Sequence, residues 1–277
     1  MKVAITGASG YVGNGLSKGF QNHGHEVLAL SRRPCTPRSF SYSLDDDPRQ
    51  LPWEGVDVLI HSAYDFTLRT WQEILKTNIN ASIALLQAAR EAGVRHLVFI
   101  SSMSAFDGCR SNYGKAKRMI EKEALALGAV VIRPGLVWGE SSGGIMGTFE
   151  KLVARLPLVP FIAGGECLHQ YLIHEADLSE AVIAIAGNPS FAGSLFSVAH
   201  PTAVSIHAIL QAIARRSRLS RAYCPVPWQL VMAGLKCTET LGLPSLFRSD
   251  SLTGIVHGYP DPAITSVPGG NSYRPFQ

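Results

Sequence analysis

One stretch near the start of the chain decides the fold: Thr6-Gly7-Ala8-Ser9-Gly10-Tyr11-Val12-Gly13. It follows a short apolar run and opens a stretch of helical periodicity, which is the context of a phosphate-binding glycine turn. Gly7 would permit the tight turn, Gly10 would let the backbone approach a pyrophosphate, and Gly13 would let helix and strand pack closely. The free N–H groups and positive dipole end of the helix would face that anion. An ordinary glycine-rich turn is the alternative, but the flanking strand and helix favour a dinucleotide site. We assign the intervening residues to the same site: Ser9, Tyr11 and Val12.

Short apolar runs alternate with longer helical patterns, which is typical of βαβ units around a parallel sheet. The runs are continuous, as expected for strands buried on both faces. The predicted strands are residues 3–6, 26–30, 56–61, 96–100 and 129–133, and the predicted helices are residues 12–23, 68–92 and 113–127. We therefore predict an α/β fold, with a Rossmann-type, doubly wound parallel sheet in a dinucleotide-binding domain over residues 1–135.

The pattern changes after Pro134, where glycine and proline become frequent and the strand signals weaken. Residues 136–277 are predicted to form a smaller, C-terminal substrate-side region that is interleaved with returning strands of the sheet. The last of its helical patterns is apolar on one side, and we interpret it as a core or subunit-contact helix in preference to a membrane-surface helix. The helices predicted here are residues 145–155, 176–186, 205–215 and 228–241.

Composition and charge narrow the class of protein. The 277 residues are 46% hydrophobic and 17% charged, which is enough apolar material for a sizeable core. The net charge is +4 and no run of Lys or Arg exceeds two, so nucleic acid is not an expected partner. Five cysteines without a CxxC pair indicate reduced thiols, with neither a disulfide framework nor a metal site. We recognise no signal peptide and no apolar run long enough to span a membrane, and expect a cytoplasmic protein.

The end of the second predicted strand carries a clue to the cofactor. It continues as Ser31-Arg32-Arg33, with no Asp or Glu at the strand end. In this kind of fold an acidic residue here accepts hydrogen bonds from the adenosine ribose, whereas an arginine accommodates a 2′-phosphate. Two guanidiniums can each present a fork of donors to a phosphate. We therefore predict NADP(H) as the cofactor, with NAD(H) as the alternative if both arginines are solvated surface residues.

A second group of residues points to acid–base chemistry. The run Ser101-Ser102-Met103-Ser104, which opens with a pair of serines, follows the strand at residues 96–100. Tyr113 and Lys117 are four residues apart on the next predicted helix, where they share one face. A phenol is a poor acid or base at neutral pH, so a nearby cation must stabilise its phenolate. Lys117 is placed to do so, and a serine hydroxyl can hold a carbonyl or alcohol oxygen. The Tyr-x-x-x-Lys pair alone is a weak motif, but the carboxyl edge of a Rossmann sheet is where such folds bind ligands.

Several further motifs occur in the order of a known family. The chain resembles the extended short-chain dehydrogenases/reductases of the NAD(P)-dependent epimerase/dehydratase family over about residues 1–215. Besides the glycine turn, the serine pair and the Tyr/Lys pair, the motifs are Asp57-Val58-Leu59-Ile60-His61-Ser62-Ala63, Thr77-Asn78-Ile79-Asn80, Arg133-Pro134-Gly135-Leu136-Val137-Trp138-Gly139, Tyr171-Leu172-Ile173-His174-Glu175-Ala176-Asp177-Leu178 and Phe196-Ser197-Val198-Ala199 with Val204-Ser205.

This resemblance implies roles for individual residues. Tyr113 would be the general acid/base, Lys117 would lower its pKa and bind the nicotinamide ribose, and Ser102 would hydrogen-bond the substrate oxygen. Asn78 would support the geometry around the lysine. Cofactor contacts are implied at His61, Ser62, Ala63 and Pro134. Family members often form homodimers through the helices predicted here at residues 68–92 and 113–127.

The departures from the family pattern bear on the substrate. Tyr113 follows Ser102 by only eleven positions, about half the spacing usual in members that act on sugar nucleotides, so the loop that helps to cover the substrate is missing. We therefore carry three hypotheses: an oxidoreductase or epimerase of a sugar nucleotide or similar polar alcohol, a carbonyl reductase of a smaller and less polar substrate, and a dinucleotide-binding regulatory protein without catalysis. The presence of both Tyr113 and Lys117 favours an enzyme.

Overall fold

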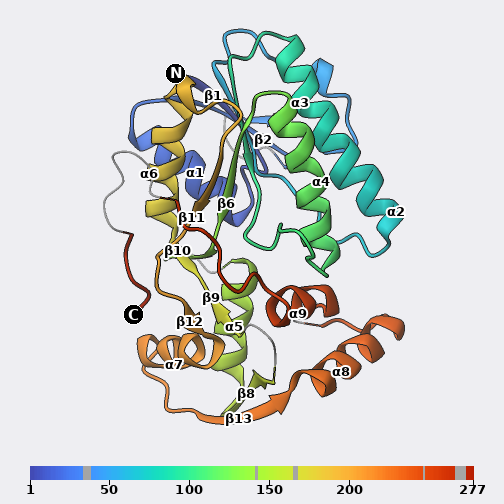
Figure 1. Ribbon diagram of the computed structural model, residues 1–277, viewed down its shortest axis with the longest axis vertical. Coiled ribbons are helices and arrows are strands. Elements are labelled where there is room, and N and C mark those ends of the chain that lie inside the picture. The colour runs from blue at the N-terminus through green and yellow to red at the C-terminus, as the bar shows by residue number, and fades with distance from the viewer. Residues whose placement is uncertain (34–38, 141–142, 165–167, 246, 266–272) are drawn as a thin grey trace.

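A seven-stranded parallel sheet forms the centre of the computed structural model, which describes residues 1–33, 39–140, 143–164, 168–245, 247–265 and 273–277 (Figure 1). The strand order is β11-β6-β5-β4-β1-β2-β3, so the chain winds outward from β1 in one direction and then from β4 in the other. This is the doubly wound arrangement predicted from the sequence, and its switch point lies between β1 and β4, where such sheets bind ligands. The strands are β1 (Lys2–Thr6), β2 (Glu26–Ser31), β3 (Ser39–Ser41), β4 (Val58–His61), β5 (His96–Ile100), β6 (Val130–Pro134) and β11 (Leu195–Val198).

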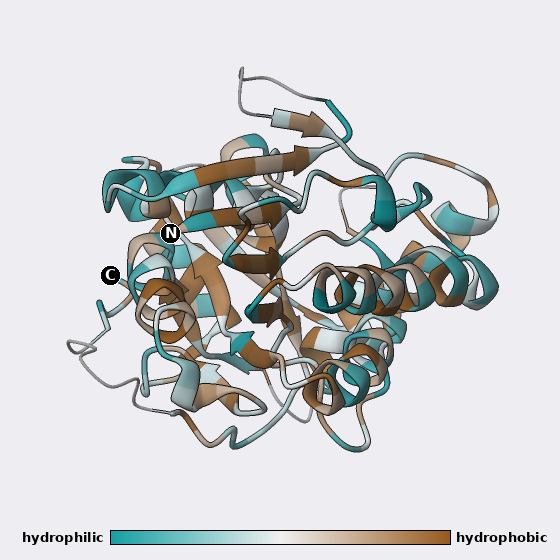
Figure 2. Ribbon diagram, turned by 90° about the horizontal axis from the view of Figure 1, so that it is seen from above, coloured by the Kyte–Doolittle hydropathy of each residue, from teal (hydrophilic) through white to brown (hydrophobic). Residues whose placement is uncertain are grey.

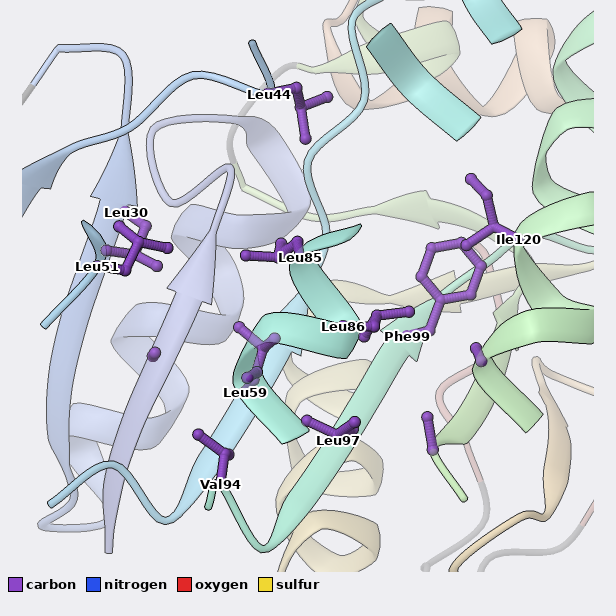
Figure 3. Packing of buried hydrophobic residues seen from close by; sticks show 14 of the residues in the cluster. Leu30, Leu44, Leu51, Leu59, Leu85, Leu86, Val94, Leu97, Phe99 and Ile120 are labelled. Carbon is purple, nitrogen blue, oxygen red and sulfur yellow. The ribbon is translucent and has the colours of Figure 1, made fainter. Parts of the chain in front are cut away.

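Helices cover both faces of the sheet because each inner strand has apolar side chains on both sides. α1 (Tyr11–Asn22) and α6 (Glu175–Ala186) pack on one face, and α3 (Ala81–Glu91) and α4 (Asn112–Ala126) on the other. In β5, for example, Val98 points to the first face and Phe99 to the second. Figure 3 shows the second face, where Leu86, Leu97, Phe99 and Ile120 meet, and the hydropathy colours of Figure 2 place the apolar strands at the centre.

The long helix predicted over residues 68–92 is three helical segments in succession. The first, α2 (Trp71–Glu73), begins at Trp71 because Thr70 and Glu73 form a capping box. A π-helical segment, η2 (Ile74–Asn80), follows and leads into α3. Gly93 ends the helix as expected, since it adopts the left-handed conformation with φ of +85°. A π segment inside a helix often marks a functional site, and this one carries Asn78.

The later part of the chain both returns to the sheet and builds a second lobe. α6 and β11 join the sheet as the expected returning elements, while the division into domains at residue 135 stays a prediction. The described part of the lobe contains three short two-stranded sheets and several helices, and most of these elements contribute side chains to a third apolar cluster. These elements are β7 (Leu136–Trp138) with β10 (Leu172–His174), β8 (Leu158–Ala163) with β13 (Ala222–Pro227), β9 (His169–Gln170) with β12 (Val204–Ser205), α5 (Gly144–Arg155), α7 (Ile206–Arg216), α8 (Trp228–Thr240) and α9 (Ser249–Val256). Single-turn 3-10 helices lie at Pro48–Gln50 and Pro189–Phe191.

α8 corrects one sequence interpretation. It is not a core helix, because none of its residues is buried. Part of its apolar surface lines a cavity and part faces solvent, whereas a core helix would have both covered. The other interpretation, a subunit-contact helix, stays a prediction. In the described part of the chain, no helix combines the length and apolar character needed to cross a membrane.

Candidate active site

The glycine turn connects β1 to α1 with the geometry that the sequence predicted. Gly7 has φ of +68°, a conformation that favours glycine, and a Cβ there would lie 2.9 Å from the Cα of Ala63. A Cβ on Gly13 would lie 2.2 Å from the Gly7 carbonyl oxygen, so only glycine lets helix and strand approach this closely. No side chain caps the N-terminus of α1 at Gly10. The first N–H groups of α1 are therefore available to an anion.

His61 holds this turn from behind. Its ring is fully buried and shares hydrogen bonds of 2.7 Å with the hydroxyl of Thr6 and of 2.7 Å with that of Ser82. Burial, with a smaller effect of the Lys117 charge, lowers the pKa of His61 to about 3, so the ring is neutral at pH 7. Its side chain does not line the cavity that adjoins the turn. His61 thus supports the strand end from within the protein, and its contact with a cofactor stays a prediction.

One cavity of about 1770 Å³ extends from the glycine turn to the start of α4 and into the lobe. Ligand pockets commonly measure about 300–1,000 Å³, so this cavity has room for a dinucleotide and a second ligand. It lies at the switch point of the sheet. The predicted cofactor residues that line it are Gly7, Ser9, Gly10, Tyr11, Val12, Gly13, Ser31, Arg32, Ser62, Ala63, Lys117 and Pro134.

The two arginines after β2 have different positions. Arg32 lines the cavity, its side chain is 69% exposed, and its Nη1 lies 3.4 Å from the Oδ2 of Asp65. Arg33 is exposed and does not line the cavity. Its carbonyl oxygen accepts a hydrogen bond from Ser31. Of these two side chains, only that of Arg32 therefore adjoins the cavity, and contact of either guanidinium with a 2′-phosphate stays a prediction.

Ser102, Tyr113 and Lys117 meet at the far end of the same cavity. Burial raises the pKa of Tyr113 to about 12, and a hydrogen bond with the Ser102 side chain opposes that rise. The Lys117 ammonium donates to the carbonyl oxygen of Ile100 at 2.8 Å and lies 6.0 Å from the centre of the Tyr113 ring. A phenol, a hydroxyl and a buried amine thus line the same part of the cavity, and their joint role in acid–base chemistry stays a prediction.

A buried ionic network lies beneath the lysine. Glu121 is fully buried and accepts hydrogen bonds from Ser101 at 2.6 Å and from two nitrogens of Arg133 at 2.7 and 2.6 Å. Burial lowers the pKa of Lys117 to about 7, and the Glu121 charge one helical turn away raises it. Arg133 does not line the cavity. Its guanidinium therefore pairs with Glu121 behind the cavity wall.

Asn78 also acts from behind the cavity wall. Its side chain is buried, accepts a hydrogen bond from the Asp65 N–H at 2.8 Å and donates one to the Asp65 carbonyl at 2.9 Å. It does not line the cavity. Asn78 therefore fixes the loop after β4, and its support of the geometry around Lys117 stays a prediction.

The outer wall of the site was not predicted from the sequence. Tyr64 and Phe66 stand beside Tyr113, with ring centres 5.0 and 5.4 Å from it. Asp250, at the start of α9, accepts hydrogen bonds from the backbone N–H groups of Asn112 and Tyr113 at 2.6 and 3.0 Å. The aromatic sequence Tyr-Asp-Phe directly after β4 was an available signal for the first pair. Nothing local could indicate Asp250, which lies 137 residues from the tyrosine.

Comparison with known proteins agrees with this geometry. The profile of the NAD dependent epimerase/dehydratase family matches residues 3–198, and the chain belongs to this family. A ceramide reductase of Caulobacter vibrioides is 30% identical over 200 residues, covering 68% of this chain and 61% of the relative. A UDP-glucose 4-epimerase of Lactobacillus helveticus is 28% identical over 196 residues, covering 58% and 59%. The chain thus spans about six tenths of the length of these two relatives.

The fold has close counterparts among solved structures. The complex of Thermus thermophilus UDP-glucose 4-epimerase with NAD superposes with a TM-score of 0.66 at 19% identity, covering 93% of this chain and 99% of that one. At this level of identity the likeness shows a shared Rossmann-type fold. No group of three or more His, Cys, Asp or Glu side chains that could hold a metal ion occurs among the residues described.

Proposed function

We propose that this protein is an NADP(H)-dependent oxidoreductase that transfers hydride at an alcohol or carbonyl carbon. The observation that carries the proposal is a single cavity with an open helix N-terminus at one end and Ser102, Tyr113 and Lys117 at the other. The residues present fit a dinucleotide, because the glycine turn leaves space that a Cβ would fill and presents unpaired N–H groups to a pyrophosphate. The bound nicotinamide would supply or accept the hydride.

Each of the three side chains has a role in moving the proton. In the reducing direction, the substrate carbonyl would accept hydrogen bonds from Ser102 and Tyr113, and the Tyr113 hydroxyl would give up its proton to that oxygen. The resulting phenolate needs a cation, which Lys117 supplies from the same face of α4. With a pKa of about 7, Lys117 is charged in a substantial fraction of molecules at neutral pH. In the oxidising direction the phenolate takes the proton back from the alcohol.

Substitution of Tyr113 tests this mechanism. Tyr113→Phe removes the proton donor and keeps the ring, so we expect the affinity for NADPH to stay nearly unchanged and turnover to fall about 100-fold or more. The measurements are NADPH fluorescence titration, oxidation of NADPH with a panel of aldehydes and ketones, and reduction of NADP⁺ with UDP-sugars, whose alcohol groups can only be oxidised. Tyr223→Phe is the control, since Tyr223 lies in β13, does not line the cavity and donates only to the Leu210 carbonyl. Full activity of Tyr113→Phe contradicts the proposal.

The preference for NADP(H) over NAD(H) rests on Arg32. We expect NADPH to bind at least about tenfold more tightly than NADH, and Arg32→Ala to remove that difference. Arg33→Ala is the matched control, because its side chain lies outside the cavity lining and should leave the ratio unchanged. Equal affinity for both nucleotides in the unsubstituted protein would make NAD(H) the cofactor, in line with the NAD-dependent family to which the chain belongs.

Two classes of substrate remain from the sequence analysis. The names of the relatives, a UDP-glucose 4-epimerase and a ceramide reductase, support a polar sugar nucleotide and an apolar lipid respectively. A non-catalytic regulatory role is the third alternative. The presence of both Tyr113 and Lys117 beside the cavity favours an enzyme over that alternative. Location in the cytoplasm and assembly as a homodimer stay predictions.

A further inference from the structure

The wall of the cavity beyond Tyr113 is built of apolar side chains from two distant parts of the chain. On one side the Phe66 ring packs against Tyr113 and, at 4.8 Å, against Tyr64. On the other side lie Trp228 and Met232 of α8 and Leu243 beyond its end. An apolar path therefore begins at the reacting phenol and extends outward to the surface.

These apolar side chains are unusually open to water for their size. Phe66 is 60% exposed and Leu243 is 52% exposed, although both line the cavity. Tyr259, which stacks on Phe106 at 4.9 Å, lines it as well and is 38% exposed. Large apolar groups gathered in a concave wall are the usual mark of a binding site, since a ligand that covers them removes their surface from water.

The charged groups near this wall hold the protein together. Arg248 donates to the backbone carbonyl oxygens of Phe66 and of Leu68, the latter at 3.0 Å. Glu239 accepts from the Ser249 N–H at 2.8 Å and hydroxyl at 2.6 Å. The other cationic side chains described on this part of the lining are exposed to solvent: Arg69, Arg110 and Lys236. A diphosphate placed against the inner wall would meet aromatic carbon in place of cations, which is unfavourable for a buried charge.

From this arrangement we infer that the substrate is a ketone, or the corresponding secondary alcohol, that carries an unbranched hydrocarbon chain. The carbonyl oxygen lies at Ser102 and Tyr113, and the chain extends along Phe66 and between Leu243 and the cavity-facing side of α8. In the reducing direction the carbonyl carbon gains a hydride from the reduced nicotinamide and the oxygen gains the Tyr113 proton, which yields the alcohol and the oxidised nicotinamide. The inference rests on the proposed function for the reaction and on the wall for the substrate.

The experiment is a chain-length series of methyl ketones, measured in two ways. Binding of 2-hexanone, 2-octanone and 2-decanone to the protein loaded with NADP⁺ is followed by calorimetry, and kcat/KM is followed with NADPH. We expect affinity to rise about threefold for each methylene that enters the apolar wall, or roughly eightyfold from 2-hexanone to 2-decanone. UDP-glucose is the competing ligand. An affinity that does not change with chain length, or oxidation of UDP-glucose by NADP⁺ at a higher kcat/KM than reduction of 2-decanone by NADPH, overturns the inference.

Variants locate the chain and separate the two proposals. Phe66→Ala and Leu243→Ala should each reduce the gain between 2-hexanone and 2-decanone about threefold or more, while Leu158→Ala should leave it unchanged, because that leucine is 53% exposed but lies outside the cavity. Equal effects of all three variants contradict the inference. If affinity rises with chain length but no ketone is reduced, the substrate wall is upheld and the proposed reaction fails. If short polar carbonyls are reduced without a chain-length effect, the reaction is upheld and the wall assignment fails.

Discussion

Lys117 is a cationic side chain enclosed in the protein, with only 2% of the residue exposed. Its surroundings are the Ile100 carbonyl oxygen at 2.8 Å and the aromatic rings of Phe99 and Tyr64, whose centres lie 4.7 and 5.4 Å from the ammonium. Burial disfavours the charged form, which is why its pKa falls to about 7. An apolar side chain of similar length at this buried position would make the folded protein more stable. The lysine therefore lowers the free energy of unfolding.

That cost predicts a pH dependence of stability. Because the pKa of Lys117 is about 7 in the folded protein and about 10.4 in an unfolded chain, the unfolded state binds more protons between these values and stability rises with pH across this window. Below pH 7 the penalty is fully present. We therefore expect Lys117→Met to be more stable than the unsubstituted protein at pH 6, with a difference that shrinks toward pH 10.

Urea unfolding at intervals from pH 6 to 10 measures this difference. Lys115→Met, on the exposed side of the same helix, is the control and should show no such trend. A constant difference between Lys117→Met and the unsubstituted protein across the range would mean that Lys117 titrates normally. In that case Lys117 would keep its charge throughout the neutral range, and its stabilisation of a Tyr113 phenolate would not change with pH near 7.

At the scale of elements, the first turn of α9 contacts the N-terminus of α4. The Asp250 carboxylate accepts from the first two N–H groups of α4, and Ser111 accepts from the Gly114 N–H at 3.1 Å. A carboxylate at a helix N-terminus satisfies unpaired donors and interacts favourably with the helix dipole. Since Tyr113 is the second residue of this helix, the same contact fixes the backbone of the proposed acid.

Substitution of Asp250 tests the link between the two helices. Asp250→Ala should lower the free energy of unfolding by about 1 kcal/mol and reduce kcat, whereas Asp250→Asn keeps an acceptor oxygen and should recover most of both. Urea denaturation and steady-state kinetics provide the measurements, with the exposed Asp261→Ala as the control. Identical stability of Asp250→Ala and the unsubstituted protein would show that the contact contributes nothing in solution.

Some helices and strands could be predicted from the sequence and others could not. Strands buried on both faces and helices with regular apolar spacing could be predicted within about two residues, since their patterns follow from local geometry. Three features could not be predicted, because each depends on tertiary contacts. They are the π segment, the direction of the Arg33 side chain after β2 and the position of α9. The triad of Ser102, Tyr113 and Lys117 was predictable from the edge of the sheet and helical spacing. Its apolar wall arises from residues more than 150 positions apart and left no local pattern.

The whole molecule combines two unequal parts around one cavity. Two apolar clusters lie on the two faces of the sheet, and the third lies in the lobe beneath it. α8 contributes to none of the three clusters and contacts mainly α9, β8 and β13 (Figure 1). Its outward stripe of Leu230, Ala233, Cys237 and Leu241 is exposed and apolar. The strands of the sheet are therefore packed on both faces, whereas α8 has fewer contacts to oppose its local unfolding.

This contrast predicts the pattern of amide hydrogen exchange. Amides of β1, β4 and β5 should exchange only through global unfolding, because they are paired on both sides and buried, whereas those of α8 should exchange orders of magnitude faster through local opening. Mass spectrometry of peptic fragments at several protein concentrations measures both. Protection of α8 equal to that of α4 at every concentration contradicts the prediction. Protection that rises with concentration instead indicates a second copy on the exposed stripe, and Leu230→Glu should then abolish it.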